Sequence, residues 1–226
     1  MNRKNDALAD AETESASGWR GSREIWLGAA KRAFLDSGLE AVKIQPLAAG
    51  LNISRASFYW FFRDRAALLE ALLEEWEAKN TGAFTAACAA YAETIAEAML
   101  NLISVFHDEA RFESQLDFAV RGWAHQSDAV MTRVNREDAL RLDAIRALFE
   151  RFGFAPDKAD VRARAIYLVQ IGYISMQTRE DNAARMARVA DYVRIFCGED
   201  PTEGEMARFH AGLQFVPTAP EGGGKP

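Results

Sequence analysis

Cysteine is scarce in this chain, which has two cysteines among 226 residues. Cys88 and Cys197 lie far apart, and neither belongs to a Cys-x-x-Cys pair or to a cluster of cysteine and histidine. This pattern excludes a disulfide framework and gives no sign of a metal site or a bound cofactor. A reducing cytoplasm is the natural compartment for such a chain.

Long apolar runs are also missing. Residues 1–18 are rich in Ala, Ser, Asp and Glu and lack the apolar stretch of a secretory signal. No later segment approaches the roughly 18 consecutive apolar residues that span a bilayer. A hydrophobic content of 49% still provides enough apolar side chains for a buried core. We therefore expect a soluble cytoplasmic protein that makes no contact with a membrane.

Signals of β-structure are nearly absent. The sequence has no sustained alternation of apolar and polar residues and no Asn-Gly or Asp-Gly turn, whereas Ala, Leu, Glu and Arg dominate. This predicts an all-α fold. The expected helices span residues 22–37, 44–51, 54–61, a long segment from 64 onward, 84–106, 112–124, 128–152, 156–178 and 183–197.

Positive charge is in the minority, with a formal net charge of −6, which at first argues against DNA binding. The charge is unevenly distributed, however. Residues 20–65 hold eight basic and four acidic residues, so this segment carries about +4 and the remainder about −10. A basic module on an acidic body is typical of a protein that docks on DNA at one end. Ordinary surface scatter remains the alternative on charge alone.

Residues 44–62, with the sequence IQPLAAGLNISRASFYWFF, place two short helices around a turn at residues 51–53. This pattern is typical of a helix-turn-helix, in which the second helix enters the major groove and the first crosses the backbone. Leu47 and Ala48 fix the first helix inward, Ile53 fills the turn, and Phe58 anchors the second helix. Asn52 suits the turn because asparagine tolerates the left-handed conformation.

Several polar and aromatic side chains of this motif are expected to face outward, toward DNA. Helix-start residues and a tyrosine hydroxyl suit phosphate oxygens, whereas guanidinium, amide and hydroxyl groups suit base edges. The expected phosphate contacts are Lys43, Tyr59 and Arg65. The expected base contacts are Gln45, Arg55, Ser57 and Trp60, and Ser54 caps the second helix beside them.

The order and spacing of these positions strongly resemble the tetracycline-repressor (TetR) family of transcriptional regulators. The resemblance covers about residues 22–70. It implies a homodimer that binds a double-stranded DNA operator through the N-terminal three helices, with a larger helical domain for dimerisation and ligand binding. The matching residues are Gly38, Leu47, Ala48, Ile53, Ser54, Arg55, Phe58, Tyr59, Phe62, Leu68 and Leu69.

Three positions depart from the family's pattern. Lys43 stands where a Ser or Thr cap is usual, and Asn52 replaces a turn glycine. Trp60 replaces a smaller side chain or an imidazole, so it either contacts a thymine methyl or sugar or packs on a neighbouring helix. Arg65 matches a lysine that usually touches a phosphate. For Arg63, a solvated position and a DNA contact are both open.

The polar composition of residues 1–19 and the proline and glycine of residues 216–226 predict flexible tails. The resemblance implies a DNA-binding domain at 20–65 and a regulatory and dimerisation domain at 66–215. It also implies that the last two long helices pair with those of a second subunit, although packing within one subunit is the alternative. The residues expected at the dimer interface are Ala165, Leu168, Gly172, Met176, Val189, Tyr192, Val193 and Phe196. The residues expected around a small, largely apolar ligand are Met99, Trp123, His125 and Tyr173.

Two other classes of function find less support. An enzyme would need a catalytic or metal motif, but the three histidines are far apart and HExxH, GxSxG, P-loop and Glu-x-x-His motifs are all missing. A pure protein adaptor would be expected to lose the outward basic and hydroxyl groups, which this chain keeps. We therefore expect a ligand-responsive transcriptional regulator, a repressor rather than an enzyme. The alternative is a DNA-binding regulator without a small-molecule ligand.

Overall fold

The computed structural model describes residues 21–217, and every regular element within this range is a helix. The prediction of an all-α fold is therefore confirmed. The chain divides into two compact units, Met1–Glu74 and Glu75–Pro226, and the division falls inside helix α5 (Arg65–Trp76) rather than at residue 65. The tail expected at 1–19 lies outside the described residues, as does the part of the C-terminal tail from residue 218.

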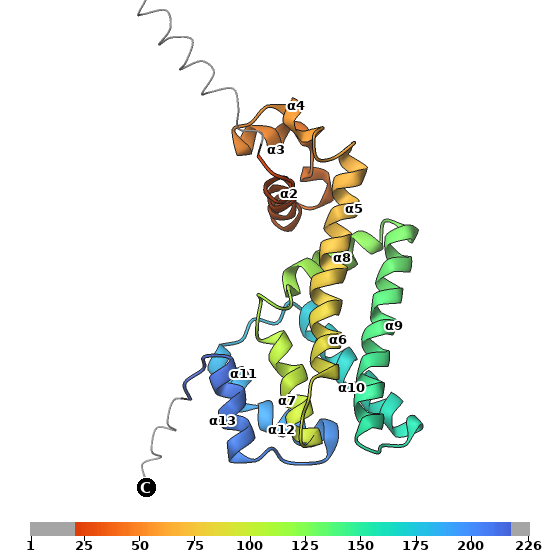
Figure 1. Ribbon diagram of the computed structural model, residues 1–226, viewed down its shortest axis with the longest axis vertical. Coiled ribbons are helices and arrows are strands. Elements are labelled where there is room, and N and C mark those ends of the chain that lie inside the picture. The colour runs from red at the N-terminus through yellow and green to blue at the C-terminus, as the bar shows by residue number, and fades with distance from the viewer. Residues whose placement is uncertain (1–20, 218–226) are drawn as a thin grey trace, which may run out of the picture. The chain divides into compact units, whose positions relative to one another are not determined.

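The first unit is built from helices, and side chains cap the starts of three of them (Figure 1). The Ser22 hydroxyl accepts a hydrogen bond from the Ile25 amide at 3.3 Å at the start of the first helix, and Asp64 accepts one from the Ala67 amide at 2.8 Å at the start of α5. Such bonds satisfy amides that the helix itself leaves unpaired. The elements are α2 (Arg23–Ser37), the 3-10 turn η1 (Leu39–Ala41), α3 (Ile44–Leu51), α4 (Arg55–Phe58) and the first part of α5.

Aromatic side chains form the centre of this unit. Trp26 and Phe58 are fully buried and meet edge to face, with ring centroids 5.2 Å apart. Phe62 stacks on Phe58, with ring centroids 5.5 Å apart. The packing of Phe58 therefore holds the four-residue α4 against α2. A helix this short is not stable through its own hydrogen bonds and depends on such packing.

The second unit is a bundle of eight further helices among the described residues (Figure 1). Helix α9 packs on α6, α8 and α10, and α7 packs on α6, α12 and α13. One apolar core runs through the bundle. The helices are α6 (Gly82–Ala89), α7 (Ile95–Phe106), α8 (Ser114–Ala124), α9 (Asp128–Arg151), α10 (Pro156–Ser175), α11 (Asn182–Ala187), α12 (Val189–Cys197) and α13 (Glu203–Gly212).

The structure differs from the predicted helices in three places. The helix expected at 84–106 is interrupted after Ala89, and Thr94 caps a new helix by accepting a hydrogen bond from the Glu97 amide at 3.0 Å. The segment 183–197 divides into α11 and α12. Helix α13 was not expected from the sequence. It begins with a capping box in which Thr202 and Glu205 satisfy each other's amides, a local signal that the periodicity analysis missed.

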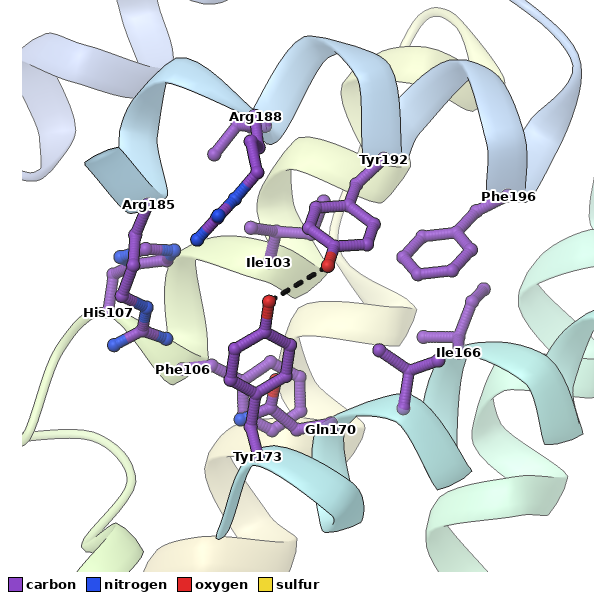
Figure 2. Close-up of a pocket in the computed structure, with 12 residues that line it drawn as sticks. Ile103, Phe106, His107, Ile166, Gln170, Tyr173, Arg185, Arg188, Tyr192 and Phe196 are labelled. Atoms are coloured by element: carbon purple, nitrogen blue, oxygen red, sulfur yellow. Dashed lines mark hydrogen bonds between the residues drawn. The ribbon is translucent and has the colours of Figure 1, made fainter. Parts of the chain in front are cut away.

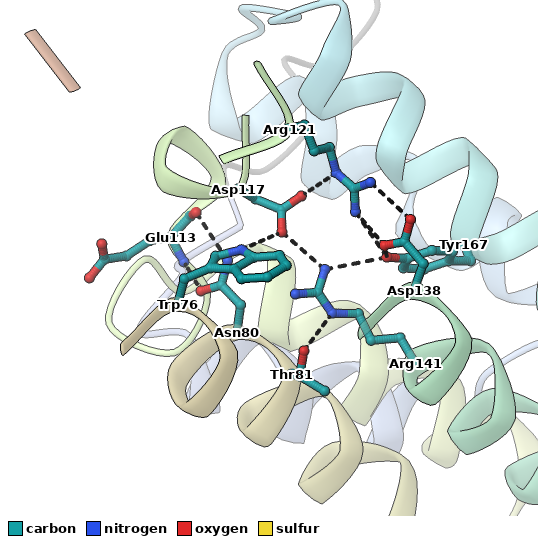
Figure 3. A network of polar contacts seen from close by, with 9 residues as sticks. All are labelled: Trp76, Asn80, Thr81, Glu113, Asp117, Arg121, Asp138, Arg141 and Tyr167. Carbon is teal, nitrogen blue, oxygen red and sulfur yellow. Dashed lines mark hydrogen bonds and ion pairs between the residues drawn. The ribbon is translucent and has the colours of Figure 1, made fainter. Parts of the chain in front are cut away.

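A buried polar network ties together the start of the second unit (Figure 3). The Asp117 carboxylate on α8 accepts hydrogen bonds from Trp76 Nε1 at 2.9 Å, Arg141 Nη1 at 3.0 Å and Arg121 Nε at 2.8 Å. The side chains of Asp117 and Arg141 are both completely inaccessible to solvent. Burial alone would raise the pKa of Asp117, but the charges of Arg141 and Arg121 outweigh it and lower that pKa.

The network extends from the end of α5 to α10. After Trp76 the helix widens into a π-helical turn, η2 (Glu77–Thr81), and Arg141 Nε donates to the Thr81 hydroxyl of this turn at 3.0 Å. The same guanidinium donates to the Tyr167 hydroxyl at 3.3 Å. Tyr167 in turn donates to Asp138 at 2.6 Å. Four helices and the π turn thus share a single set of buried polar contacts.

Within residues 21–217, no helix is both long enough and apolar enough to cross a membrane.

Candidate nucleic-acid interface and ligand pocket

Helices α3 and α4 form the helix-turn-helix that the sequence predicted. Asn52 ends α3 in the left-handed conformation, with φ 55° and ψ 41°. The Ile53 amide then donates to the Ala48 carbonyl at 3.1 Å, which closes the turn. Leu47 and Ala48 are buried, so the inward face of α3 is also as predicted. The expectation that asparagine serves in place of a turn glycine is confirmed.

The first turn of α4 differs from the prediction at Ser57. The Ser54 hydroxyl caps the helix by accepting a hydrogen bond from the Ser57 amide at 3.3 Å, as expected. The Ser57 hydroxyl, however, is buried and donates to the Ser54 carbonyl at 2.6 Å. Ser57 therefore points into the protein, and the expectation that it faces outward is wrong. A serine in a helix's first turn can turn back to the backbone, and the sequence pattern did not exclude this.

The outer surface of the motif carries two large aromatic side chains and an arginine. Tyr59 is 50% exposed and Trp60 is 67% exposed, unusual for aromatic residues in so small a unit. Most of the accessible surface of Trp60 therefore stays in contact with solvent. Arg55 is exposed one turn earlier, and its Nη2 lies 3.4 Å from the Tyr59 hydroxyl. Lys43 and Gln45, at the start of α3, are exposed as well.

Arg65 has a structural task that the sequence did not reveal. Its Nε donates to the Val42 carbonyl at 2.6 Å and its Nη2 to the Leu39 carbonyl at 2.7 Å. The guanidinium thereby fastens the start of α5 to the loop that leads into α3. Two of its donor atoms are thus used by the backbone, and the expected phosphate contact through its remaining N–H groups stays a prediction.

The second unit contains a pocket between α7, α10, α11 and α12 (Figure 2). Its empty space is about 540 Å³ when the solvent at its mouth is included. Its lining residues are Ile103, Phe106, His107, Ile166, Val169, Gln170, Tyr173, Arg185, Arg188, Val189, Tyr192 and Phe196.

The pocket has a polar end and an apolar end. Figure 2 shows Arg185, Arg188 and His107 together on one side and Ile166 and Phe196 on the other. Between them, the hydroxyl groups of Tyr173 and Tyr192 share a hydrogen bond of 2.8 Å. Burial, and then the nearby charge of Arg185, lower the pKa of His107 to about 4. His107 is therefore neutral at pH 7, and the positive charge of the pocket comes from the arginines.

One of the four residues predicted to bind a ligand, Tyr173, lines this pocket. Met99 is fully buried in the apolar core, and His125 is exposed at the end of α8 near Trp123 in the sequence. None of these three residues lines the pocket. The sequence analysis missed Arg185 and Arg188. Arg185 lies on α11, and Arg188 is the residue between α11 and α12. The basic residues of this stretch look like an ordinary solvated face, and no sequence signal distinguishes these two from such a face.

The residues predicted for the dimer interface fall into two groups. Leu168 on α10 is 62% exposed, and Met176, the residue that caps the end of α10, is 80% exposed. Ala165 is exposed on the same stripe as Gly172. On α12 the outcome differs, since its expected interface residues pack within their own subunit. Val189, Val193 and Phe196 are buried, and Tyr192 is half-buried and bonded to Tyr173. The expectation that these α12 side chains form an outer surface is therefore wrong.

An α3–turn–α4 pair with basic and aromatic side chains on its outer surface defines a helix-turn-helix DNA-binding protein. The family model described as "Bacterial regulatory proteins, tetR family" matches residues 27–72, which include this pair. The similarity to this family thus lies in the N-terminal segment that holds the helix-turn-helix. No curated protein matches it by sequence.

Solved structures share the fold along most of the chain. Mycobacterium smegmatis AmtR is 18% identical with a TM-score of 0.59, covering 89% of this chain and 98% of its own. A Rhodococcus sp. protein described as a TetR-family transcriptional regulator is 16% identical with a TM-score of 0.56, covering 77% and 98%. Salmonella enterica GusR is 15% identical with a TM-score of 0.54, covering 85% and 93%. At these identities the likeness concerns the fold alone.

Proposed function

We propose that this chain is a dimeric, ligand-responsive transcriptional repressor that binds a pseudo-palindromic DNA operator in the cytoplasm. The observation that carries the proposal is the exposure of Arg55, Tyr59 and Trp60 on one short segment that Phe58 anchors in the core. Large exposed aromatic side chains are costly in water, so their presence beside a guanidinium favours a surface that binds another molecule. The protein acts by binding, not by catalysis.

The exposed groups divide into those that position DNA and those that read it. Lys43, at the start of α3, and the Tyr59 hydroxyl suit phosphate oxygens. Gln45 and Arg55 carry the donors that pair with base edges, and Trp60 offers an apolar surface to a thymine methyl. Ser54 is exposed at the start of α4, beside Arg55. Residues 20–65 would thus supply the whole DNA-binding surface.

Dimerisation is proposed through the outer stripe of α10. A stripe of exposed apolar side chains on one helix is unfavourable in a monomer and favours burial against a second copy. Ala165 and Gly172 lie on this stripe and permit close approach of a partner helix. Two DNA-binding units related by a two-fold axis would then read inverted half-sites. A repressor role follows if the bound dimer excludes other proteins from that DNA.

Ligand response is proposed through the pocket in the second unit. A ligand alters operator affinity only if it binds one arrangement of the dimer better than another. Couplings of about 1–3 kcal/mol are usual for such regulation. The pocket is bounded by α10, the helix proposed to hold the dimer together. A bound ligand would therefore contact a helix that also takes part in dimerisation.

Base reading by Arg55 gives a specific test of this proposal. Arg55→Ala should weaken binding to the preferred operator by about 1–3 kcal/mol and relax the preference at one position of each half-site. Arg55→Lys is the matched control: it keeps the charge but lacks the two-pronged donor geometry, so it should keep the salt dependence and lose the preference. Binding titrations on an operator series at several salt concentrations provide the measurement. An unchanged sequence preference in Arg55→Ala with a reduced salt dependence would show a phosphate contact instead.

A further inference from the structure

The polar end of the pocket carries positive charge that no acidic residue of its lining neutralises. Its lining includes two arginines and no acidic residue. Arg188 forms an ion pair with Glu180 at 2.5 Å, so its charge is balanced by an acid outside the lining. Arg185 has no carboxylate within ion-pair distance among the described residues, and its guanidinium lies 5.9 Å from the centre of the Tyr173 ring. One positive charge is therefore left over.

Two hydrogen-bonding atoms at this end are enclosed and lack partners among residues 21–217. They are the Nε donor of Arg188 and the Nδ1 atom of His107. Enclosed polar atoms without partners cost free energy, and a bound ligand with oxygen atoms would relieve that cost. Both atoms belong to residues that line the pocket beside Arg185 (Figure 2).

The rest of the pocket is apolar. Phe106, Ile166 and Phe196 line it. In Figure 2 the linked Tyr173 and Tyr192 side chains lie between the arginines and the pair Ile166 and Phe196. An occupant must therefore offer an apolar body to these walls and a negatively charged oxygen group to the guanidiniums. A purely polar anion would leave the walls unfilled, and a neutral apolar molecule would leave the charge of Arg185 unpaired.

We propose that the pocket binds a small amphipathic carboxylate, with its head at Arg185 and Arg188 and its aliphatic or aromatic body toward Phe196. This inference deepens the proposed function and rests on it only for the effect of the ligand on DNA binding. A single negative charge fits better than two, because Glu180 already balances Arg188. Glu109 feels the charge of Arg185 from the neighbouring turn without forming an ion pair, so it does not replace the ligand's carboxylate.

Calorimetric titration of the full chain with three carboxylates and their primary amides tests the proposal without DNA. The probes are hexanoate, octanoate and 4-phenylbutanoate, which share the head group and differ in their bodies. We expect at least one of them to bind with a dissociation constant below about 1 mM, and its amide to bind at least about tenfold more weakly. If none of the three carboxylates binds, or if the amide binds as well as the acid, the proposal is wrong.

Substitutions at Arg185 locate the binding site. Arg185→Gln should weaken carboxylate binding by about tenfold or more and leave amide binding unchanged, whereas Arg185→Lys should keep most of the affinity because it keeps the charge. Arg179→Gln is the matched control, since Arg179 is exposed on the preceding loop and does not line the pocket. Equal effects of the substitutions at 185 and 179 would place the carboxylate elsewhere and overturn the assignment.

Repeating the DNA titration with the bound carboxylate separates this inference from the proposed function. Carboxylate binding that leaves operator affinity unchanged would support the pocket assignment and refute ligand response. Operator binding without any carboxylate binding would refute the pocket assignment and leave DNA recognition intact.

Discussion

Replacing Asp117 with alanine should lower the free energy of unfolding by about 3–5 kcal/mol, the usual cost of breaking a buried ion pair. The carboxylate accepts hydrogen bonds from Trp76, Arg121 and Arg141, and its removal leaves the Arg141 charge inaccessible to water. Arg121 keeps a second carboxylate, Asp138, so most of the cost falls on Arg141. Denaturant unfolding at pH 7 measures the loss.

A matched pair at the surface provides the control. Asp191 and Arg194 lie 2.6 Å apart with side chains that are 62% and 56% exposed, so Asp191→Ala should change stability by less than about 1 kcal/mol. Asp117→Asn keeps the shape of the side chain, so its loss of unfolding free energy should lie between those of Asp117→Ala and Asp191→Ala. If Asp117→Ala is no more destabilising than Asp191→Ala, the network does not hold the second unit together.

The contribution of Asp117 should also depend on pH in a defined direction. Its pKa is lowered in the folded state, so the stabilisation is fully present above the ordinary aspartate pKa of about 3.9. It is lost as the pH falls through the lowered folded-state pKa. The difference in stability between the wild type and Asp117→Asn should therefore shrink below about pH 4.

Replacing Leu168 with aspartate should abolish dimers and reduce operator affinity by two orders of magnitude or more, about 3 kcal/mol. Leu168 is 62% exposed at the middle of the α10 stripe, so a charge there costs little in the free subunit. It costs much when a second copy would bury it. Loss of the dimer separates the two half-site contacts, which then no longer bind as one unit. Sedimentation and binding titrations measure the two effects.

Two further variants decide whether the effect belongs to the interface. Gly172→Arg should behave in the same way, since a Cβ atom built at Gly172 meets nothing within 4 Å in its own subunit. Leu140→Asp is the control, because Leu140 is also an exposed leucine, 47% exposed, but belongs to α9 and not to the α10 stripe. A dimer that survives both α10 substitutions would mean that another surface joins the subunits.

The DNA-binding motif could be predicted from sequence because its determinants are local. Asn52 in the left-handed conformation, the Ser54 cap and the Asp64 cap each depend on residues within a few positions. Phe58 combines an apolar side chain with a fixed place in the motif, so its burial also follows from the pattern. Local hydrogen bonds and hydrophobic periodicity therefore account for this part of the fold.

The features that the sequence did not predict depend on contacts between distant residues. Arg65 bonds to carbonyls more than twenty positions earlier, and nothing beside it in the sequence indicates this. The sequence also did not predict that the apolar stripe of α12 packs inside its own subunit, because such a stripe suits an interface with a second subunit equally well. Periodicity tells which residues of a helix share a face, but not what that face meets.

The central claim is that this chain recognises DNA sequence as a dimer. Selection of bound fragments from a random pool of double-stranded DNA by the full-length wild type tests it most directly. The account predicts enrichment of one sequence with two inverted half-sites, bound by two copies of the chain. A pool that shows no enriched sequence, or an enriched sequence without inverted symmetry bound by one copy, would contradict the account.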